Sequence, residues 1–235
     1  MNKNLILAPS NKASLVKEWM SDKENRNFDV ILVYYDEDGG EKDLEEFADI
    51  IFLRKGFKYP TIYNLIKTEM ISIDNYDYIW LPDDDILLNT SQINQMFDLM
   101  KKYDLWLAMP SIIKGVGSFN TFSTQNHQDG NILRYVGFIE VQCPVFSKYA
   151  FQKCLNTFNE SQSGWGIDLV WPKLLNRPLN KMAILDIIAA KHTRPVGHGD
   201  LYKRLNINPD IEMRILMKKY GVDRDANTYG TIKIS

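Results

Sequence analysis

Three consecutive aspartates follow an apolar run in the stretch YDYIWLPDDDILL, residues 76–88. Like charges in contact repel one another, and partial burial strengthens the repulsion. A bound cation would relieve it, and so would full solvation in a turn. In an extended chain Asp83 and Asp85 point to one side and Asp84 to the other. Two carboxylates on one side can hold a hard divalent cation, so we favour a metal site over a turn.

A histidine offers a further ligand of a different kind. His192 stands in AAKHTRP, directly after the apolar run MAILDIIAA, and the chain has only three histidines. Imidazole is a good ligand for Mn²⁺-like ions and a poor one for Mg²⁺. A surface histidine at a strand end is the alternative. Its place beside Arg194 at a predicted strand end favours the metal interpretation, with Mn²⁺ preferred and Mg²⁺ as the second choice.

The pattern GWGID at residues 164–168 combines two glycines, an aromatic ring and a carboxylate. Gly164 and Gly166 flank Trp165 and allow tight backbone geometry. Trp165 offers a flat surface for a sugar ring, or it fills the core. Asp168 falls near a predicted helix start, where a carboxylate either favours the helix dipole or faces a substrate as a base. The residues alone leave both pairs of alternatives open.

The elements that must position these groups alternate along the first part of the chain. Short apolar runs predict strands at 4–10, 28–36, 48–56, 76–81 and 105–111, and amphipathic stretches predict helices at 10–20, 59–70 and 90–104. Such alternation indicates a mostly parallel sheet covered by helices on both faces. Ligands bind such sheets at the carboxyl ends of the strands, and this is where the aspartates lie.

The pattern changes near Ser111. Residues 112–134 are polar and aperiodic, and a loop this long is usually functional or mobile. Beyond it we expect a strand with a Pro break at 135–146, followed by two short helices at 147–155 and 164–175. A core strand at 182–190 and a tail helix at 208–221 complete the chain. We therefore predict one domain in three parts. Residues 1–110 form the half in which strands and helices alternate, residues 111–200 form a more irregular half, and residues 201–235 form a helical tail.

The composition narrows the classes of function. The net charge is -2 and the pI about 6.0, so a broad basic face for nucleic acid is not expected. The two cysteines fit a reducing compartment, and no apolar run is long enough to span a membrane. We expect a cytoplasmic protein. The Lys and Arg residues in 191–219 leave peripheral contact with the inner face of the membrane open, with a solvated helix face as the alternative. The sequence does not fix the oligomeric state.

Several of these segments resemble known enzymes. YDYIWLPDDDI, the strand leading into CPVF, GWGIDLVWP and ILDIIAAKHTRPV are similar to DUF707, a family of proposed glycosyltransferases, and more broadly to GT-A nucleotide-sugar glycosyltransferases. The resemblance runs from about Val30 to His198, and GWGIDLVWP is its most specific element. It implies one GT-A-like α/β domain with a Rossmann-like sheet. Residues 1–110 would bind the nucleotide, and 111–200 would complete the metal site and bind the acceptor.

The resemblance also implies a donor and the residues that hold it. The donor would be a sugar activated as a nucleoside diphosphate, and a divalent ion would act as a Lewis acid on the leaving group. The implied metal ligands are Asp83, Asp85 and His192. The candidates for donor contacts are Asp83, Asp84, Lys55, Lys58 and Tyr34. For the two lysines, solvated loop positions remain the alternative.

On the acceptor side the resemblance implies an inverting mechanism with Asp168 as the base, because in-line attack needs a base opposite the leaving group. Trp165, Gly166 and Glu140 are the candidate acceptor contacts. The acceptor would be a glycan or a lipid-linked glycan in bacterial surface polysaccharide or lipopolysaccharide synthesis. The alternatives are an inactive nucleotide- or sugar-binding module and a metal-dependent nucleotidyltransferase.

Overall fold

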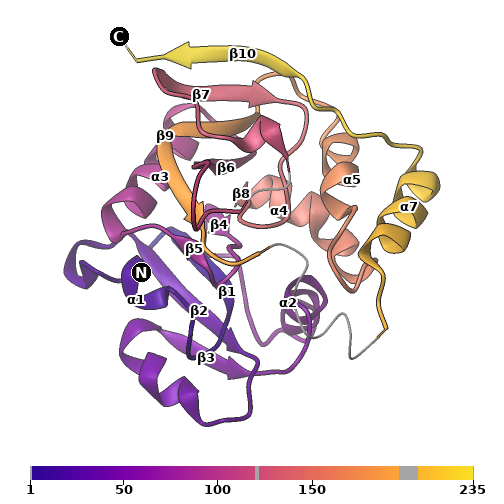
Figure 1. Ribbon diagram of the computed structural model, residues 1–235. Helices are drawn as coiled ribbons and strands as arrows, with labels where there is room; N and C mark the ends of the chain where they lie inside the picture. The colour runs from indigo at the N-terminus through magenta and orange to yellow at the C-terminus, as the bar shows by residue number, and fades with distance from the viewer. Residues whose placement is uncertain (1, 120–121, 196–205, 235) are drawn as a thin grey trace.

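The computed structural model describes residues 2–119, 122–195 and 206–234. A single large sheet runs through the molecule in the order β10-β7-β9-β6-β8-β4-β1-β2-β3, and β5 pairs with β9 off this path (Figure 1). The strands are β1 (Asn4–Ser10), β2 (Phe28–Tyr34), β3 (Ile50–Leu53), β4 (Tyr78–Trp80), β5 (Ile86–Leu87), β6 (Leu107–Ile112), β7 (Asn131–Val136), β8 (Val145–Ser147), β9 (Met182–His192) and β10 (Thr228–Lys233).

Most of the sheet is parallel, as the alternation predicts. The pairs β1–β2, β2–β3, β1–β4 and β6–β9 are parallel. Strand β8 pairs antiparallel with both β4 and β6, so these two strands point the same way. The edge strands β7 and β10 add antiparallel pairs beyond β9. The carboxyl ends of β4 and β9 therefore meet at the same edge of the sheet.

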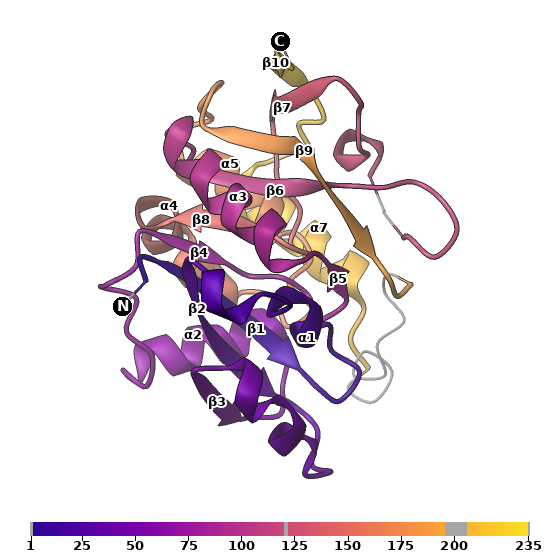
Figure 2. The ribbon, with the colours of Figure 1, turned by 90° about the vertical axis from the view of Figure 1, so that its left-hand side faces the viewer.

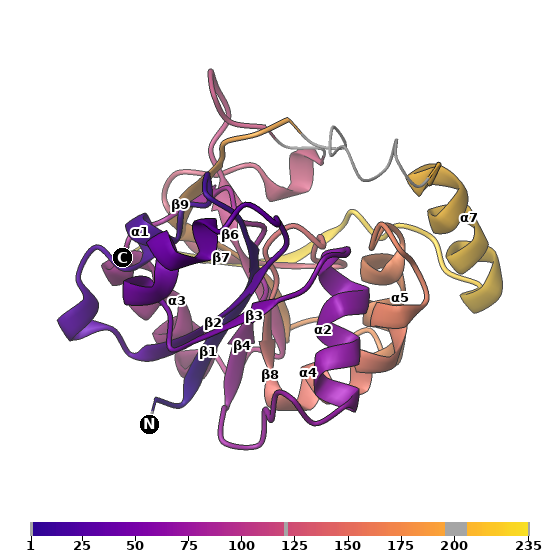
Figure 3. The ribbon, with the colours of Figure 1, turned by 90° about the horizontal axis from the view of Figure 1, so that it is seen from below.

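Helices cover both faces of this sheet. The α-helices are α1 (Val16–Trp19), α2 (Lys58–Lys67), α3 (Thr90–Lys102), α4 (Lys148–Cys154), α5 (Ile167–Leu174) and α7 (Pro209–Tyr220). The 3₁₀ helices are η1 (Lys23–Asn25), η2 (Gly40–Phe47), η3 (Ser123–Gln125) and η4 (Leu155–Asn159). Figure 2 looks onto the face that carries α1 and α3, and Figure 3 shows α2, α4 and α5 on the opposite side, with α7 outside α5. The α/β prediction is confirmed. Within the described ranges, no helix has the length and apolar character needed to cross a membrane.

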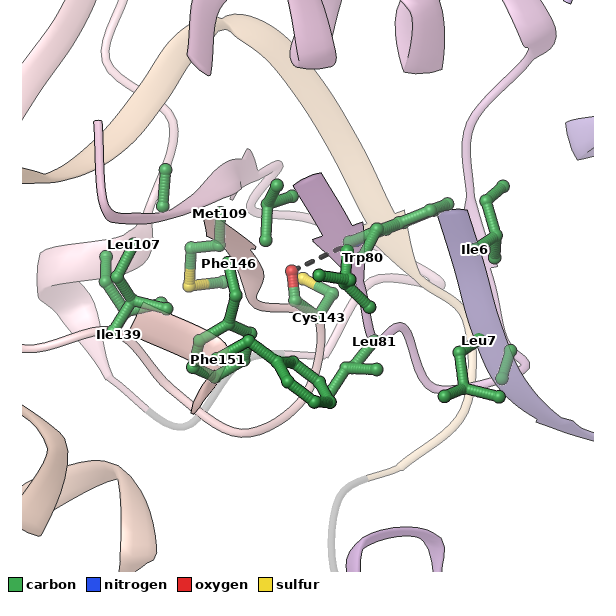
Figure 4. Packing of buried hydrophobic residues seen from close by; sticks show 14 of the residues in the cluster. Ile6, Leu7, Trp80, Leu81, Leu107, Met109, Ile139, Cys143, Phe146 and Phe151 are labelled. Carbon is green, nitrogen blue, oxygen red and sulfur yellow. Dashed lines mark hydrogen bonds between the residues drawn. The ribbon is translucent and has the colours of Figure 1, made fainter. Parts of the chain in front are cut away.

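The core lies between the sheet and these two helix layers. Strand β1 is buried along most of its length, which explains why it reads as a continuous apolar run rather than an alternating one. Trp80 on β4 packs against Trp19 with ring centroids 5.3 Å apart. Its indole N–H donates to the carbonyl oxygen of Cys143 at 3.1 Å (Figure 4). This bond fixes the segment before β8 against β4, immediately before the aspartates.

Helix α1 is much shorter than the predicted 10–20 segment. The Ser14 hydroxyl accepts the backbone N–H of Asn11 at 2.6 Å, and the Asn11 side chain accepts that of Ala13 at 2.9 Å. Such local side-chain bonds offer the backbone an alternative to a helix. The N–H of Leu15 donates instead to the carbonyl oxygen of Asp84 at 2.8 Å. The turn after β1 is thereby tied to the acidic triplet.

The end of the chain contains a strand that the sequence did not reveal. Helix α7 begins at its Asn208 cap and ends at Gly221, as predicted. Beyond it, Thr228–Lys233 forms β10 on the outer side of β7, so the segment predicted as a helical tail contains an edge strand as well as the helix. The predicted loop 112–134 is also too long, because its last residues belong to β7. Inside the sheet, Arg134 on β7 forms a buried ion pair with Asp186 on β9 at 2.7 Å.

Candidate functional site

The short pairing of β5 with β9 brings the acidic triplet to the histidine. Ile86 lies opposite His192 in this ladder, so the residue before β5 falls beside the imidazole. The distance between His192 Nε2 and Asp85 Oδ1 is 3.2 Å. Asp83, Asp85 and His192 each offer a ligand atom, and these atoms lie within 4.8 Å of one another. The three predicted metal ligands thus converge, although the histidine is far from the two aspartates along the sequence.

The donors around this cluster fit a divalent cation. The Nδ1 atom of His192 is 3.0 Å from the carbonyl oxygen of Phe119, and only an N–H on Nδ1 can donate to that carbonyl. In the neutral imidazole the lone pair of Nε2 faces Asp85 Oδ1, which has no other hydrogen-bond donor. A lone pair and a carboxylate repel each other unless a proton on Nε2 or a metal ion lies between or beside them. Histidine ligands of metals are usually oriented by such a bond on the other ring nitrogen.

The pKa shifts of His192 and Asp85 indicate that a positive charge is favourable at the cluster. Burial lowers the pKa of His192, but the hydrogen bond and charge of Asp85 outweigh it and raise the pKa above its ordinary value. Burial raises the pKa of Asp85, but the imidazole and Arg194 outweigh it and hold the pKa below its ordinary value. A proton on the imidazole and a metal ion satisfy the same need.

Asp84 points away from the cluster, as strand alternation predicts. Its Oδ2 accepts from the hydroxyls of Ser14 at 2.8 Å and Tyr35 at 3.0 Å. The guanidinium of Arg194 binds Asp84 and also lies 3.2 Å from Asp85 Oδ2. Both oxygens of Asp84 are therefore engaged within the protein. This carboxylate anchors the turn after β1 and orients Arg194, rather than being free for a donor.

Lys58 does not have the environment that the donor-contact prediction requires. It is the first residue of α2, and its side chain is only 9% exposed. The ammonium lies 2.5 Å from Asp83 Oδ1 and 2.7 Å from the carbonyl oxygen of Val141, with further carbonyl contacts. Because an ammonium has three N–H donors, these contacts exhaust its capacity. Lys58 holds Asp83 in place instead of facing a phosphate.

The other two predicted donor contacts also lie elsewhere. Tyr34 is buried, and its hydroxyl donates to Asp38 at 2.7 Å. The next residue, Tyr35, carries the hydroxyl that reaches the acidic triplet. Lys55 forms an exposed ion pair with Glu37 at 3.2 Å. Neither Tyr34 nor Lys55 contacts the triplet. Strand β2 is buried along most of its length, so its sequence does not indicate which of the two tyrosines points toward the triplet.

A pocket forms at the start of α5. The N-cap of helix α5 is Gly166, which has a φ of +91°. A Cβ added to Gly166 would lie 2.7 Å from the Cα of Met213 on α7. Only glycine therefore lets α7 pack so closely on the GWGID turn. The pocket is lined by Glu140, Trp165, Asp168, Met213, Phe122 and Arg224, among others. All predicted acceptor-side residues meet here, together with two from the C-terminal segment, Met213 and Arg224, that were not predicted.

The two carboxyl groups in the pocket differ in pKa. Burial raises the pKa of Asp168 to about 6, opposed by its bond from the backbone N–H of Leu169 at 3.0 Å. Burial and then the charge of Asp168 raise the pKa of Glu140 to about 8. One oxygen of Glu140, Oε2, is buried without a hydrogen-bond partner. Because the pKa of Asp168 is the lower of the two, Asp168 is the first of these carboxyl groups to lose its proton as the pH rises.

A short segment connects the pocket to the metal-ligand cluster. Glu140 and Val141 line the pocket. The carbonyl oxygen of Gln142 accepts the N–H of Asp83 at 2.6 Å. The Lys58 ammonium bridges Asp83 to Val141. The cluster and the pocket are therefore adjacent parts of one site at the carboxyl edge of the sheet.

Comparison with known proteins identifies the architecture. No family model matches the chain, and no curated protein matches it in sequence. Among solved structures, S. aureus TarS aligns with 95% of this chain and 41% of its own length, at 10% identity and a TM-score of 0.55. The chain thus spans less than half of that protein. The structure of TarS 1–349 in complex with UDP-GlcNAc aligns with 93% of this chain and 71% of its own, at 10% identity and a TM-score of 0.54.

The chain has a GT-A-like fold. A third structure, TarS 1–349 in complex with UDP, has 9% identity and a TM-score of 0.53 over 93% of this chain and 70% of its own. At identities near 10% these likenesses establish the fold and nothing finer.

Proposed function

We propose that this chain is a metal-dependent, inverting glycosyltransferase that moves a sugar from a nucleoside-diphosphate sugar to a hydroxyl group of a glycan acceptor. The observation that carries the proposal is the adjacency of two unlike sites. A two-carboxylate and imidazole cluster lies next to a pocket lined by Asp168, Glu140 and Trp165, and burial raises the pKa of both carboxyl groups in that pocket. The first suits a diphosphate leaving group, and the second suits a hydroxyl nucleophile.

On the donor side, Asp83, Asp85 and His192 would hold a divalent ion, and the ion would supply Lewis-acid stabilisation of the leaving diphosphate. The surrounding residues keep these ligands in place. Phe119 holds the imidazole through Nδ1, and Lys58 holds one oxygen of Asp83. Imidazole in the donor set favours Mn²⁺ over Mg²⁺. UDP-sugars are the first donors to test, because TarS, which shares the fold, binds UDP-GlcNAc.

On the acceptor side, Asp168 would take the proton of the attacking hydroxyl. The acceptor oxygen forms a bond to the anomeric carbon, the bond from that carbon to the diphosphate breaks, and its electron pair leaves with the phosphate. A base on the face opposite the leaving group makes this a single displacement with inversion. Glu140, protonated, can donate a hydrogen bond to a sugar hydroxyl, and Trp165 can stack on an apolar sugar face. We also propose membership in the DUF707 family and a role in surface polysaccharide or lipopolysaccharide synthesis.

A donor panel tests the proposal. The chain is incubated with Mn²⁺, individual nucleotide sugars and a mixture of glycan acceptors, and the released nucleotide is identified by mass. We expect a nucleoside diphosphate from one class of donor, with a product mass increased by one sugar. Donor binding without any turnover would support an inactive binding module instead. In a parallel incubation with nucleoside triphosphates and sugar phosphates, release of pyrophosphate would support a nucleotidyltransferase instead.

A further inference from the structure

Helix α7 has one face packed on the protein and an opposite face that is exposed. It lies at the outer margin of the molecule beside α5 (Figures 1 and 3). On the inner side Leu216 is buried, and Met213 packs on the GWGID turn. Glu212 accepts the backbone N–H groups of Gln162 and Ser163 at 2.9 and 2.8 Å. These contacts fix how the helix sits, and they leave its opposite face turned outward.

The outward face combines apolar and basic side chains. Ile211 and Ile215 stand one turn apart and are 55% and 59% exposed. Arg214 and Lys218 are three and seven positions after Ile211, so they lie on the same face. Both are exposed, and neither forms an ion pair with any residue in the described part of the chain. Within the described ranges, the helix presents a pair of isoleucines flanked by two cations that form no ion pair.

This combination favours a particular surface as the partner. An interfacial helix places its apolar side chains at the boundary of headgroups and acyl chains, and its Lys and Arg at anionic phosphates. Exposed isoleucines are unfavourable in water, and the cations beside them match the negative potential of an anionic leaflet. We propose that the outer face of α7 docks this chain on an anionic lipid surface through Ile211, Ile215, Arg214 and Lys218.

The position of α7 links this docking to the site. Met213 on its inner side lines the pocket that holds Asp168, and Arg224, shortly after the helix, lines it too. Docking through the outer face would therefore bring the acceptor pocket close to the lipid headgroups. Resting on the proposed function, this selects an acceptor that is itself anchored in the membrane, a lipid-linked glycan, over a free oligosaccharide.

Vesicle binding tests the docking without any need for activity. The full chain is sedimented with phosphatidylcholine vesicles that contain or lack phosphatidylglycerol. We expect binding only to the anionic vesicles, and the double variant Arg214→Gln/Lys218→Gln should bind about thirtyfold more weakly. Ile215→Ser should bind about tenfold more weakly. The control Leu53→Ser changes a side chain that is 54% exposed at the end of β3, a strand that lies far from α7 in Figures 1 and 3, and it should bind as the wild type does.

Two results would overturn the proposal: no difference between the two kinds of vesicle, or α7 variants that bind as tightly as the control. All the substitutions are at exposed positions, and thermal melts check that each variant is folded. The proposed function can fail separately. A chain that binds anionic vesicles but transfers no sugar contradicts the glycosyltransferase proposal alone, whereas transfer to a soluble acceptor without vesicle binding contradicts the docking alone.

Discussion

Replacing Asp168 by asparagine should make the protein more stable and far less active. The pKa of Asp168 is raised from 3.8 to about 6 by burial, so the folded protein binds this proton more tightly than the unfolded chain does. The stability from the neutral carboxyl is fully present below about pH 4 and is lost as the pH rises to about 6. A shift of about two pKa units corresponds to about 3 kcal/mol of unfolding free energy. At pH 7 and above the wild type is less stable by this amount than it would be with a neutral carboxyl group.

An asparagine side chain at this position is neutral at every pH, so the Asp168→Asn variant avoids this cost. The amide carbonyl oxygen can still accept the N–H of Leu169, but the NH₂ group cannot replace a carboxylate oxygen as an acceptor, and a lost hydrogen bond costs about 1 kcal/mol. We therefore expect Asp168→Asn to raise the free energy of unfolding by about 1–2 kcal/mol at pH 8. Near pH 4 the gain should disappear. Sugar transfer should fall by about two to four orders of magnitude.

Urea unfolding at pH 8 and pH 4 measures the first effect, and initial rates of nucleoside diphosphate release measure the second. The matched control is Asp186→Asn, which changes a buried carboxylate that is paired with Arg134. The control should be destabilised at pH 8. An Asp168→Asn variant that is less stable than the wild type at pH 8 would refute the argument from burial. One that transfers sugar at a near wild-type rate would remove Asp168 from the mechanism.

Two further changes test other parts of the account. Arg134→Met should lower the free energy of unfolding by about 3–5 kcal/mol in urea titrations, because it leaves the Asp186 carboxylate buried without its charged partner. A loss below about 1 kcal/mol would contradict the conclusion that this ion pair is shielded from water. Glu140→Gln keeps a neutral hydrogen-bonding group, so activity at pH 7 should change by only a few fold. In the wild type we expect activity to fall as Glu140 ionises near pH 8. This fall should be absent from the pH profile of the variant. A profile that is unchanged by the substitution would show that Glu140 does not titrate in the site.

The sequence predicts well those features whose physics is local. Strands buried on both faces appear as apolar runs, and β1, β2, β4, β6 and β9 lie where those runs predict them. The convergence of Asp83 and Asp85 with His192 follows from strand alternation together with the position of ligands at strand carboxyl ends. Strand β10 escaped prediction because it lies at an edge and is mostly exposed, so its residues show no apolar run.

What the sequence could not predict depends on contacts between distant segments. Lys58 looked like a loop lysine, but it is buried against Asp83 and Val141. A cation in the first turn of a helix is unfavourable to the helix dipole, and this signal could have indicated a buried carboxylate partner. Met213 and Arg224 reach the pocket only because α7 packs on Gly166. Nothing in their local sequence indicates that packing.

The metal site is tested most directly by calorimetry of UDP binding to the wild-type chain, with Mn²⁺ and then with EDTA. Removing the metal should weaken UDP binding by at least about tenfold, which corresponds to about 1.4 kcal/mol. In Asp85→Ala the affinity should already be low and should no longer respond to EDTA. An affinity for UDP that is the same with Mn²⁺ and with EDTA in the wild type would contradict the assignment of Asp83, Asp85 and His192 as the ligands of a metal that binds the nucleotide.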